Sequence, residues 1–279
     1  MSPSVSGRAR EAAADRAPAV LDAQPVTLDV QGTLATLRFA NPEQRGALTP
    51  EILVALREGL ARAEAARVRV VVLRGTGGVF SSGFAIDRIP ETGALEVKDE
   101  IELLCEAVEA SPVVVIALLE GYVIGAGLDV ACACDFRFAS SACRIGITPS
   151  RLGLVYTWRG VRRIERLVGR DAARWLFLTG ELVGGDEARR MGIARASYER
   201  TEDLEREVYE FAQRLSANAP RSLAGTKQIL MELDRASDVH PDVERRLHAL
   251  RVAAMQSADA REAKQAFAER RPPVFTGLT

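Results

Sequence analysis

The sequence predicts an α/β fold, in which a core of parallel, buried strands is followed by a mostly helical C-terminal part. Two nearly continuous apolar runs, residues 68–73 and 113–119, are typical of strands that are buried on both faces. A helical segment at about 97–110 lies between them, which indicates a βαβ crossover. After about Gly160, the segments with a clear periodicity are helical. These three observations decide the fold class.

The first elements are predicted from alternating side chains and from a capping pattern. Apolar residues fall on alternate positions on both sides of Gln31-Gly32, which is typical of a hairpin with one buried face. They are Val26, Leu28 and Val30, and then Ala35, Leu37 and Phe39. A helix is expected from about Pro50, because Thr49 is a favourable N-cap and proline suits the first helical position.

The C-terminal part is predicted to be a series of helices. The clearest is 201–217, where Leu204, Val208, Phe211 and Leu215 form one apolar stripe. The other helical segments are expected at 162–168, 171–178, 221–234 and about 242–270.

The first two dozen residues are predicted to be a disordered extension. They are rich in Ala, Arg and Ser and lack the apolar core of a signal peptide. Acidic residues among them argue against a transit peptide. We therefore divide the chain into an extension (1–24), an α/β core (25–200) and a helical region (201–279).

The composition favours a cytoplasmic protein that binds neither nucleic acid nor membrane. Lys and Arg number 37 against 38 Asp and Glu, so there is no basic excess for nucleic acid. No apolar run approaches the length of a membrane span. The four cysteines are expected to be reduced and buried, and they lack the partners of a metal site. They are Cys105, Cys132, Cys134 and Cys143.

Two loops rich in small residues follow buried strands. The first, residues 75–87, contains FSSGF at 80–84 and ends at Asp87. The second, residues 120–129, contains Gly125-Ala126-Gly127 and opens into a run that reads as a buried helix. A helix start presents unpaired N–H groups and a positive dipole end, which suit a developing oxyanion. Each loop taken alone also fits an ordinary tight connection.

Together, these loops resemble the crotonase (enoyl-CoA hydratase/isomerase) superfamily. The similar stretches are NPEQRGAL at 41–48, FSSGF at 80–84 with Asp87, GYVIGAG at 121–127, CDFR at 134–137 and FAERRP at 267–272. The resemblance implies a crotonase-like spiral of ββα units with a C-terminal helical region, 201–279, that forms trimers or hexamers. It also implies an acyl-CoA or acyl-carrier-protein thioester as substrate, with no prosthetic group: coenzyme A or phosphopantetheine enters as part of that substrate.

The resemblance assigns roles to several residues. The oxyanion hole would consist of the backbone N–H groups of Phe84 and Ala126. Removing one such donor costs about 10²–10³ in rate in other enzymes, so the hole would be the largest catalytic feature. For the coenzyme, the similar positions are Arg45, Ser82, Phe267 and Arg270.

The two glutamates that hydratases of this family carry are altered here. The first position holds Asp129, a shorter carboxylate that also suits the first turn of a helix for dipole reasons. The second position holds Pro149, whose side chain transfers no proton. Concerted hydration needs two positioned acid/base groups, so ordinary enoyl-CoA hydration is not the expected reaction.

Tyr156 suggests a different reaction. Thr148-Pro149, Leu152-Gly153 and Tyr156 resemble the methylmalonyl-CoA decarboxylase branch, where the tyrosine contacts the acyl group. Loss of CO₂ forms the enolate without a base. A core tyrosine with a satisfied hydroxyl is the alternative. Arg151 and Arg159 are further candidates for a substrate carboxylate, although a solvated or interface role suits each better.

We therefore expect a lyase that decarboxylates a malonyl-type thioester. One alternative is an enoyl-CoA hydratase or isomerase that uses the single carboxylate of Asp129. The other is a non-catalytic binding or scaffold protein with the crotonase fold, against which the donor pair of Phe84 and Ala126 argues.

Overall fold

The strands of the computed structural model form one large sheet and one small sheet. The structure describes residues 25–88, 99–235 and 240–274, so the predicted extension at 1–24 lies outside the described residues. The large sheet has the order β1-β2-β3-β4-β6-β8, and the small one pairs β5 with β7. The strands are β1 Val26–Gln31, β2 Leu34–Phe39, β3 Val70–Gly75, β4 Val114–Leu119, β5 Tyr122–Ile124, β6 Phe136–Ser140, β7 Arg144–Gly146 and β8 Ala196–Tyr198.

The pairing confirms the predicted hairpin and the βαβ unit. β1 runs antiparallel to β2, with Val26 opposite Phe39. Every further neighbour in the large sheet is parallel, including β3 with β4, which are joined through α2 (Glu100–Ala110). The α/β fold class is therefore as predicted.

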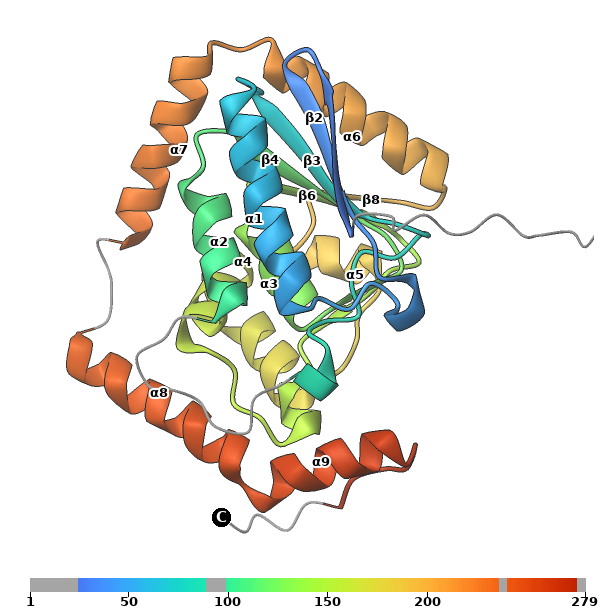
Figure 1. Cartoon of the computed structure of the whole chain (residues 1–279), viewed down its shortest axis with the longest axis vertical. Coiled ribbons are helices and arrows are strands. Elements are labelled where there is room, and N and C mark those ends of the chain that lie inside the picture. The colour runs from blue at the N-terminus through green and yellow to red at the C-terminus, as the bar shows by residue number, and fades with distance from the viewer. Residues whose placement is uncertain (1–24, 89–98, 236–239, 275–279) are drawn as a thin grey trace, which may run out of the picture.

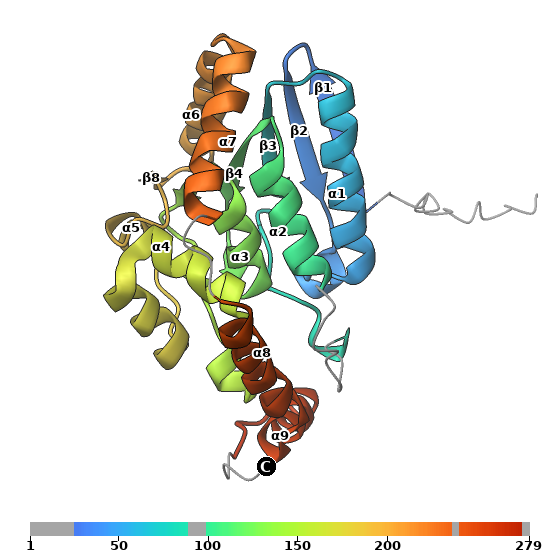
Figure 2. The same cartoon turned by 90° about the vertical axis from the view of Figure 1, so that its left-hand side faces the viewer.

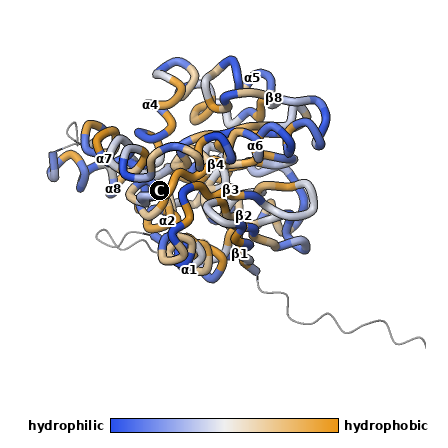
Figure 3. Tube along the Cα trace, turned by 90° about the horizontal axis from the view of Figure 1, so that it is seen from above, coloured by the Kyte–Doolittle hydropathy of each residue, from blue (hydrophilic) through white to orange (hydrophobic). Residues whose placement is uncertain are grey.

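Helices cover both faces of the large sheet (Figures 1 and 2). α1 (Pro50–Ala65), α2 and α3 (Ala126–Ala133) pack side by side on one face, and α6 (Thr201–Ser216) lies on the other. β3 supplies both cores, because Val71 and Leu73 face the α1 side while Val70 and Val72 face α6. Figure 3 shows the same layering, with hydrophobic strands between the helices.

The predicted helix starts are explained by capping. Thr49 accepts a hydrogen bond from the N–H of Ile52 at 3.4 Å, as its N-cap position predicts. Downstream lie α4 (Trp158–Arg174), the π-helical turn η4 (Trp175–Thr179) and the short α5 (Gly185–Arg190). The two helices expected at 162–168 and 171–178 are present, because Gly169 takes a non-helical conformation, with a φ of 79° and a ψ of 167°, and separates two helical parts of α4. The second part continues into η4.

The C-terminal helices extend away from the sheet at the bottom of Figure 1. The segment expected at 242–270 is two helices, α8 (Pro241–Gln256) and α9 (Ala258–Ala268), because Ser257 is extended and caps α9. α7 (Pro220–Arg235) leads into them, α8 packs on α4, and α9 packs on the 3₁₀ turn η3 (Pro149–Leu152). Among the described residues, we find no helix with the length and apolarity to span a membrane.

Candidate functional site

The two small-residue loops pair with each other like strands. The N–H of Phe80 donates to Glu120 O at 2.8 Å, the N–H of Ser81 to Tyr122 O at 2.7 Å, and the N–H of Ile124 to Ser81 O at 3.0 Å. This parallel pairing continues β3 and β4 beyond the sheet. It brings Phe84, at the end of the first loop, to the same end of the ribbon as Ala126, the first residue of α3.

Glycines allow the two loops to approach this closely. Gly83 has a φ of +106°, and a Cβ there would lie 3.0 Å from Ile124 O. A Cβ on Gly127 would lie 2.6 Å from the Cβ of Ser81. A larger residue at either position would push the loops apart, so the glycines of both motifs serve the convergence.

The N–H groups of Phe84 and Ala126 take no part in the surrounding backbone hydrogen bonds of the described residues. Leu48 N donates to Gly83 O and Ala85 N donates to Leu48 O, which passes over the N–H of Phe84. Gly125 N donates to Gly146 O at 2.9 Å, and Ala126 is too early in α3 for an intrahelical acceptor. Within the described part of the chain, neither N–H donates a hydrogen bond. We call these two groups the donor pair.

Asp129 lies in the first turn of α3 and is 1% exposed. Its Oδ2 accepts a hydrogen bond from the hydroxyl of Tyr156 at 3.0 Å. Its Oδ1 pairs with Nη1 of Arg163 at 2.5 Å. Both oxygens are acceptors, which is the arrangement of an ionised carboxylate. The structure thus brings together two of the predicted residues, Asp129 and Tyr156.

Tyr156 is held as a neutral hydrogen-bond donor. Burial, and then the negative charge of Asp129, raise the pKa of Tyr156 well above its usual value. Its ring packs against Phe177, with the centroids 5.7 Å apart. A Cβ on Gly160 would lie 2.4 Å from the Tyr156 ring and 2.7 Å from Asp129 Oδ2, so only glycine fits there.

Arg163 is the functional candidate that sequence reasoning missed. Its guanidinium joins Asp129 to Glu109, whose Oε1 lies 2.5 Å from Nε. Burial opposes its charge, but its titratable neighbours raise the pKa of Arg163 above its usual value. A signal was present in the sequence: Arg163 shares the buried stripe of α4 with Gly160 and Ile164. A charged residue on such a stripe indicates a buried pair.

The residues predicted to bind coenzyme A fall into two places. Ser82 N donates to Arg45 O at 3.1 Å, and the Arg45 guanidinium lies 5.9 Å from the ring centroid of Tyr122 beside the second loop. Phe267 and Arg270 lie at the end of α9, where Phe267 is 62% exposed. Within the described residues of this one chain, no hydrogen bond or ring contact links these two groups.

The two arginines predicted as candidates to bind a substrate carboxylate make no hydrogen bond or ion pair with Asp129 or Tyr156 among the described residues. Arg159 pairs with Glu244 of α8 at 2.6 Å and with Glu102 of α2 at 3.5 Å, and it stacks on Trp158. It therefore joins the C-terminal helices to the core. Arg151 is exposed on η3, where Pro149 occupies the first position of the turn.

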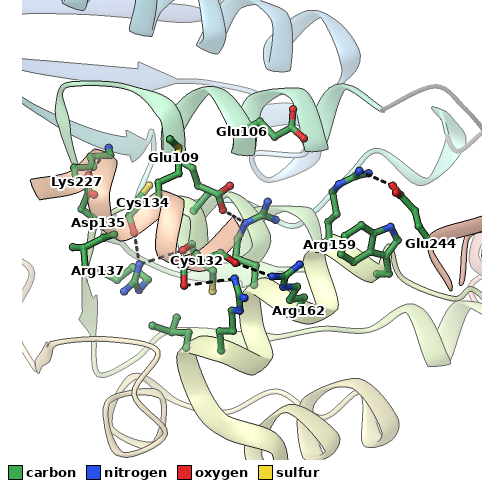
Figure 4. A pocket seen from close by; sticks show the side chains of 18 residues that line it. Glu106, Glu109, Cys132, Cys134, Asp135, Arg137, Arg159, Arg162, Lys227 and Glu244 are labelled. Atoms are coloured by element: carbon green, nitrogen blue, oxygen red, sulfur yellow. Dashed lines mark hydrogen bonds and ion pairs between the residues drawn. The ribbon is translucent and has the colours of Figure 1, made fainter. Parts of the chain in front are cut away.

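A cavity of about 790 Å³ lies at the opposite, C-terminal end of α3. Figure 4 shows its charged side chains, with Arg159 and Glu244 joined across one side. Residues of α2, α4 and α7 contribute to the lining, and many carry full charges that are paired with each other. Glu109 and Arg163 also line this cavity, whereas the unused donors lie at the other end of the helix.

Comparisons with known proteins agree with this geometry. The family model described as enoyl-CoA hydratase/isomerase matches residues 29–278. A probable enoyl-CoA hydratase of Bacillus subtilis (strain 168) is 30% identical over 259 residues, which cover 90% of this chain and 98% of that protein. Methylmalonyl-CoA decarboxylase of Escherichia coli (strain K12) is 27% identical over 248 residues, with 88% and 95% covered.

Among solved structures, methylmalonyl-CoA decarboxylase in complex with 2-nitronate-propionyl-CoA has a TM-score of 0.86 and 27% identity. The match covers 91% of this chain and 99% of that one. The predicted crotonase fold is confirmed by this likeness. The chain belongs to the enoyl-CoA hydratase/isomerase family and is an acyl-CoA-processing enzyme of the crotonase superfamily.

Proposed function

We propose that this enzyme decarboxylates a malonyl-type acyl thioester, with coenzyme A or a carrier protein as the thiol part. The observation that carries the proposal is the state of Asp129. Its two oxygens are engaged by Tyr156 and Arg163, and the side chain is buried, so it is poorly placed to activate water. The hydroxyl of Tyr156 occupies Oδ2 of that carboxylate, and Tyr156 keeps part of its own surface exposed.

The reaction needs little acid or base help. The bond between the α-carbon and the carboxylate carbon breaks, CO₂ leaves, and the electron pair passes to the thioester carbonyl as an enolate. The N–H groups of Phe84 and Ala126 hold the enolate oxygen. The neutral phenol of Tyr156 orients the leaving carboxylate, and a proton from water or a weak acid then adds to the α-carbon.

The relatives support this proposal in part. The Escherichia coli relative and the solved structure of high similarity are methylmalonyl-CoA decarboxylases. The residues Thr148, Pro149 and Tyr156 are the local likeness to that branch. Pro149 stands where a hydratase carries its second glutamate, and it begins the 3₁₀ turn η3. The second acid/base group of a hydratase is therefore missing.

Hydration or isomerisation by Asp129 is the second candidate. It is favoured by a carboxylate in the first turn of α3 and by relatives named as hydratases. Under this alternative, Asp129 would have to leave Arg163 or Tyr156 to reach a substrate proton. A binding protein without catalysis, the third possibility, has no use for a donor pair that the fold leaves unpaired.

The test is to incubate the purified protein with methylmalonyl-CoA and malonyl-CoA, and to follow CO₂ release and the shortened thioester by mass spectrometry. Crotonyl-CoA is offered in parallel. We expect CO₂ release that falls about 10²-fold in Tyr156→Phe, because the oriented phenol is lost. Hydration of crotonyl-CoA without CO₂ release would overturn the proposal, and binding without any turnover would favour the scaffold reading.

A further inference from the structure

Four side chains form a chain of contacts from Tyr156 to the end of α2. The Tyr156 hydroxyl donates to Asp129, Asp129 pairs with Arg163, and Arg163 pairs with Glu109 of α2. The four residues come from three helices and one connection, so the tertiary structure assembles them. We call them the tyrosine support network.

Arg163 controls the orientation of the Asp129 carboxylate. The Asp129 side chain is 2% exposed, and a carboxylate this buried is stable only when a charge or several donors compensate it. Arg163 holds Oδ1, which turns the other oxygen, Oδ2, toward the hydroxyl of Tyr156. The position of the phenol therefore depends on a guanidinium that does not itself contact it.

Arg163 is in turn fixed by two carboxylates at different nitrogens. Nε pairs with Glu109 and Nη1 with Asp129, both at 2.5 Å, and the Arg163 side chain is 9% exposed. A planar guanidinium that is bound at two of its nitrogens is fixed in orientation. A lysine, which has one charged nitrogen, could not make both contacts in the same way. Glu109 is 34% exposed, so it anchors the arginine from the rim.

We infer that Arg163 is a positioning residue, which acts through Asp129 to hold the Tyr156 hydroxyl where the acyl group reacts. This inference rests on the proposed function for its effect on rate, but its effect on Tyr156 can be measured without any reaction. No contact of Arg163 with a substrate is required.

The kinetic test uses Arg163→Met, Arg163→Lys and a matched control on the same helix. We expect Arg163→Met to lower kcat about 10–100-fold with KM changed by less than about threefold, because the phenol is misplaced while binding persists. Arg163→Lys should recover only part of the rate. Arg170→Met is the control, since Arg170 is 84% exposed and pairs only loosely with Glu165 at 3.4 Å.

A double-mutant cycle separates positioning from general damage. If Arg163 acts through Tyr156, then Tyr156→Phe with Arg163→Met should be no slower than Tyr156→Phe alone, within about twofold. Additive losses would overturn the inference. Should Arg163→Met fail to fold, the same cycle with Arg163→Lys decides, because the lysine keeps the charge beside Asp129.

The reaction-independent test labels the tyrosines with 3-fluorotyrosine and assigns the resonance of Tyr156 through its loss in Tyr156→Phe. We expect the ¹⁹F resonance of Tyr156 to shift or broaden in Arg163→Lys and to stay in place in Arg170→Met. An unmoved resonance in both would overturn the role of Arg163, whatever reaction the enzyme performs. A wild type without CO₂ release, but with the expected ¹⁹F shift, would instead reject the proposed function alone.

Discussion

The two ends of α3 have opposite hydrogen-bonding states. At the C-terminal end, Arg137 donates to the carbonyls of Ala131, Cys132 and Cys134, and Lys227 donates to two carbonyls and to Asp135. At the N-terminal end, the donor pair is left without a partner in the described residues. The C-terminal end, which borders the charged cavity, is therefore the satisfied one.

This difference teaches where function lies. Buried polar groups that are fully paired stabilise a fold, whereas buried donors left unpaired by it are available to a ligand. The charged side chains at the C-terminal end close the last turn of α3 and tie α7 to β4. At the N-terminal end, the carboxylate of Asp129 is paired with Arg163, and the groups left free are backbone N–H groups.

The largest expected effect comes from removing one member of the donor pair. Ala126→Pro deletes the N–H at the first position of α3, a position that proline tolerates. We expect kcat to fall about 10²–10³-fold, which is the usual cost of one oxyanion donor. Steady-state kinetics with the active thioester measure it.

The matched control for that variant is Ala258→Pro, at the first position of α9. Like Ala126, Ala258 is the first residue of its helix, but it lies away from the donor pair, so the rate of Ala258→Pro should be that of the wild type. A loss in Ala258→Pro as large as in Ala126→Pro would break the comparison between the two ends of α3.

At the satisfied end, we expect a loss of stability without a loss of rate. Lys227→Met removes the donor of two carbonyls and the cation that pairs with Asp135, which keeps the N–H of Val115 as a donor. We expect a cost of about 2–3 kcal/mol in the free energy of unfolding. Urea unfolding measures this cost, while kcat per folded molecule should be unchanged. A tenfold fall in kcat with intact folding would place this end of α3 in the reaction.

The smallest effect is expected at Gly160, which packs against both Tyr156 and Asp129. Gly160→Ala forces its Cβ against the Tyr156 ring and Asp129, at a cost of about 1–2 kcal/mol from overpacking. The rate should fall about tenfold, because the phenol moves. The control is Gly225→Ala in α7, where nothing lies within 4 Å of the added Cβ and stability should rise. Thermal melting of both variants, with their rates, tests the pair.

Much of the fold was predictable because local patterns reported it. The hairpin, the βαβ unit and α6 follow from alternation, continuous apolar runs and a helical stripe, and each is confirmed. The error arose where an extended residue interrupts a helical pattern. The break between the two helices at Gly169 was predicted, whereas Ser257 divides the last segment although both sides favour helix.

The candidate site was predicted unevenly for the same reason. The loops of Phe84 and Ala126 carry their own glycines, so the sequence indicates them directly. Asp129 and Tyr156 were named separately, and their contact spans 27 residues. The roles of Arg45, Ser82, Phe267 and Arg270 stay predictions, as does assembly of the C-terminal helices into trimers.

By itself, the sequence determined which backbone N–H groups form the donor pair, because the small residues after two buried strands decide how closely the two loops approach each other. Only the tertiary structure decided which charged and polar side chains pair with Asp129. Arg163 and Glu109 are far from Asp129 along the chain, and packing α4 against α2 and α3 brings their charges together. Contacts between side chains on different helices leave no local pattern in the sequence. The spacing of residues along one helix shows which side chains share a face, but not which other helix packs against that face.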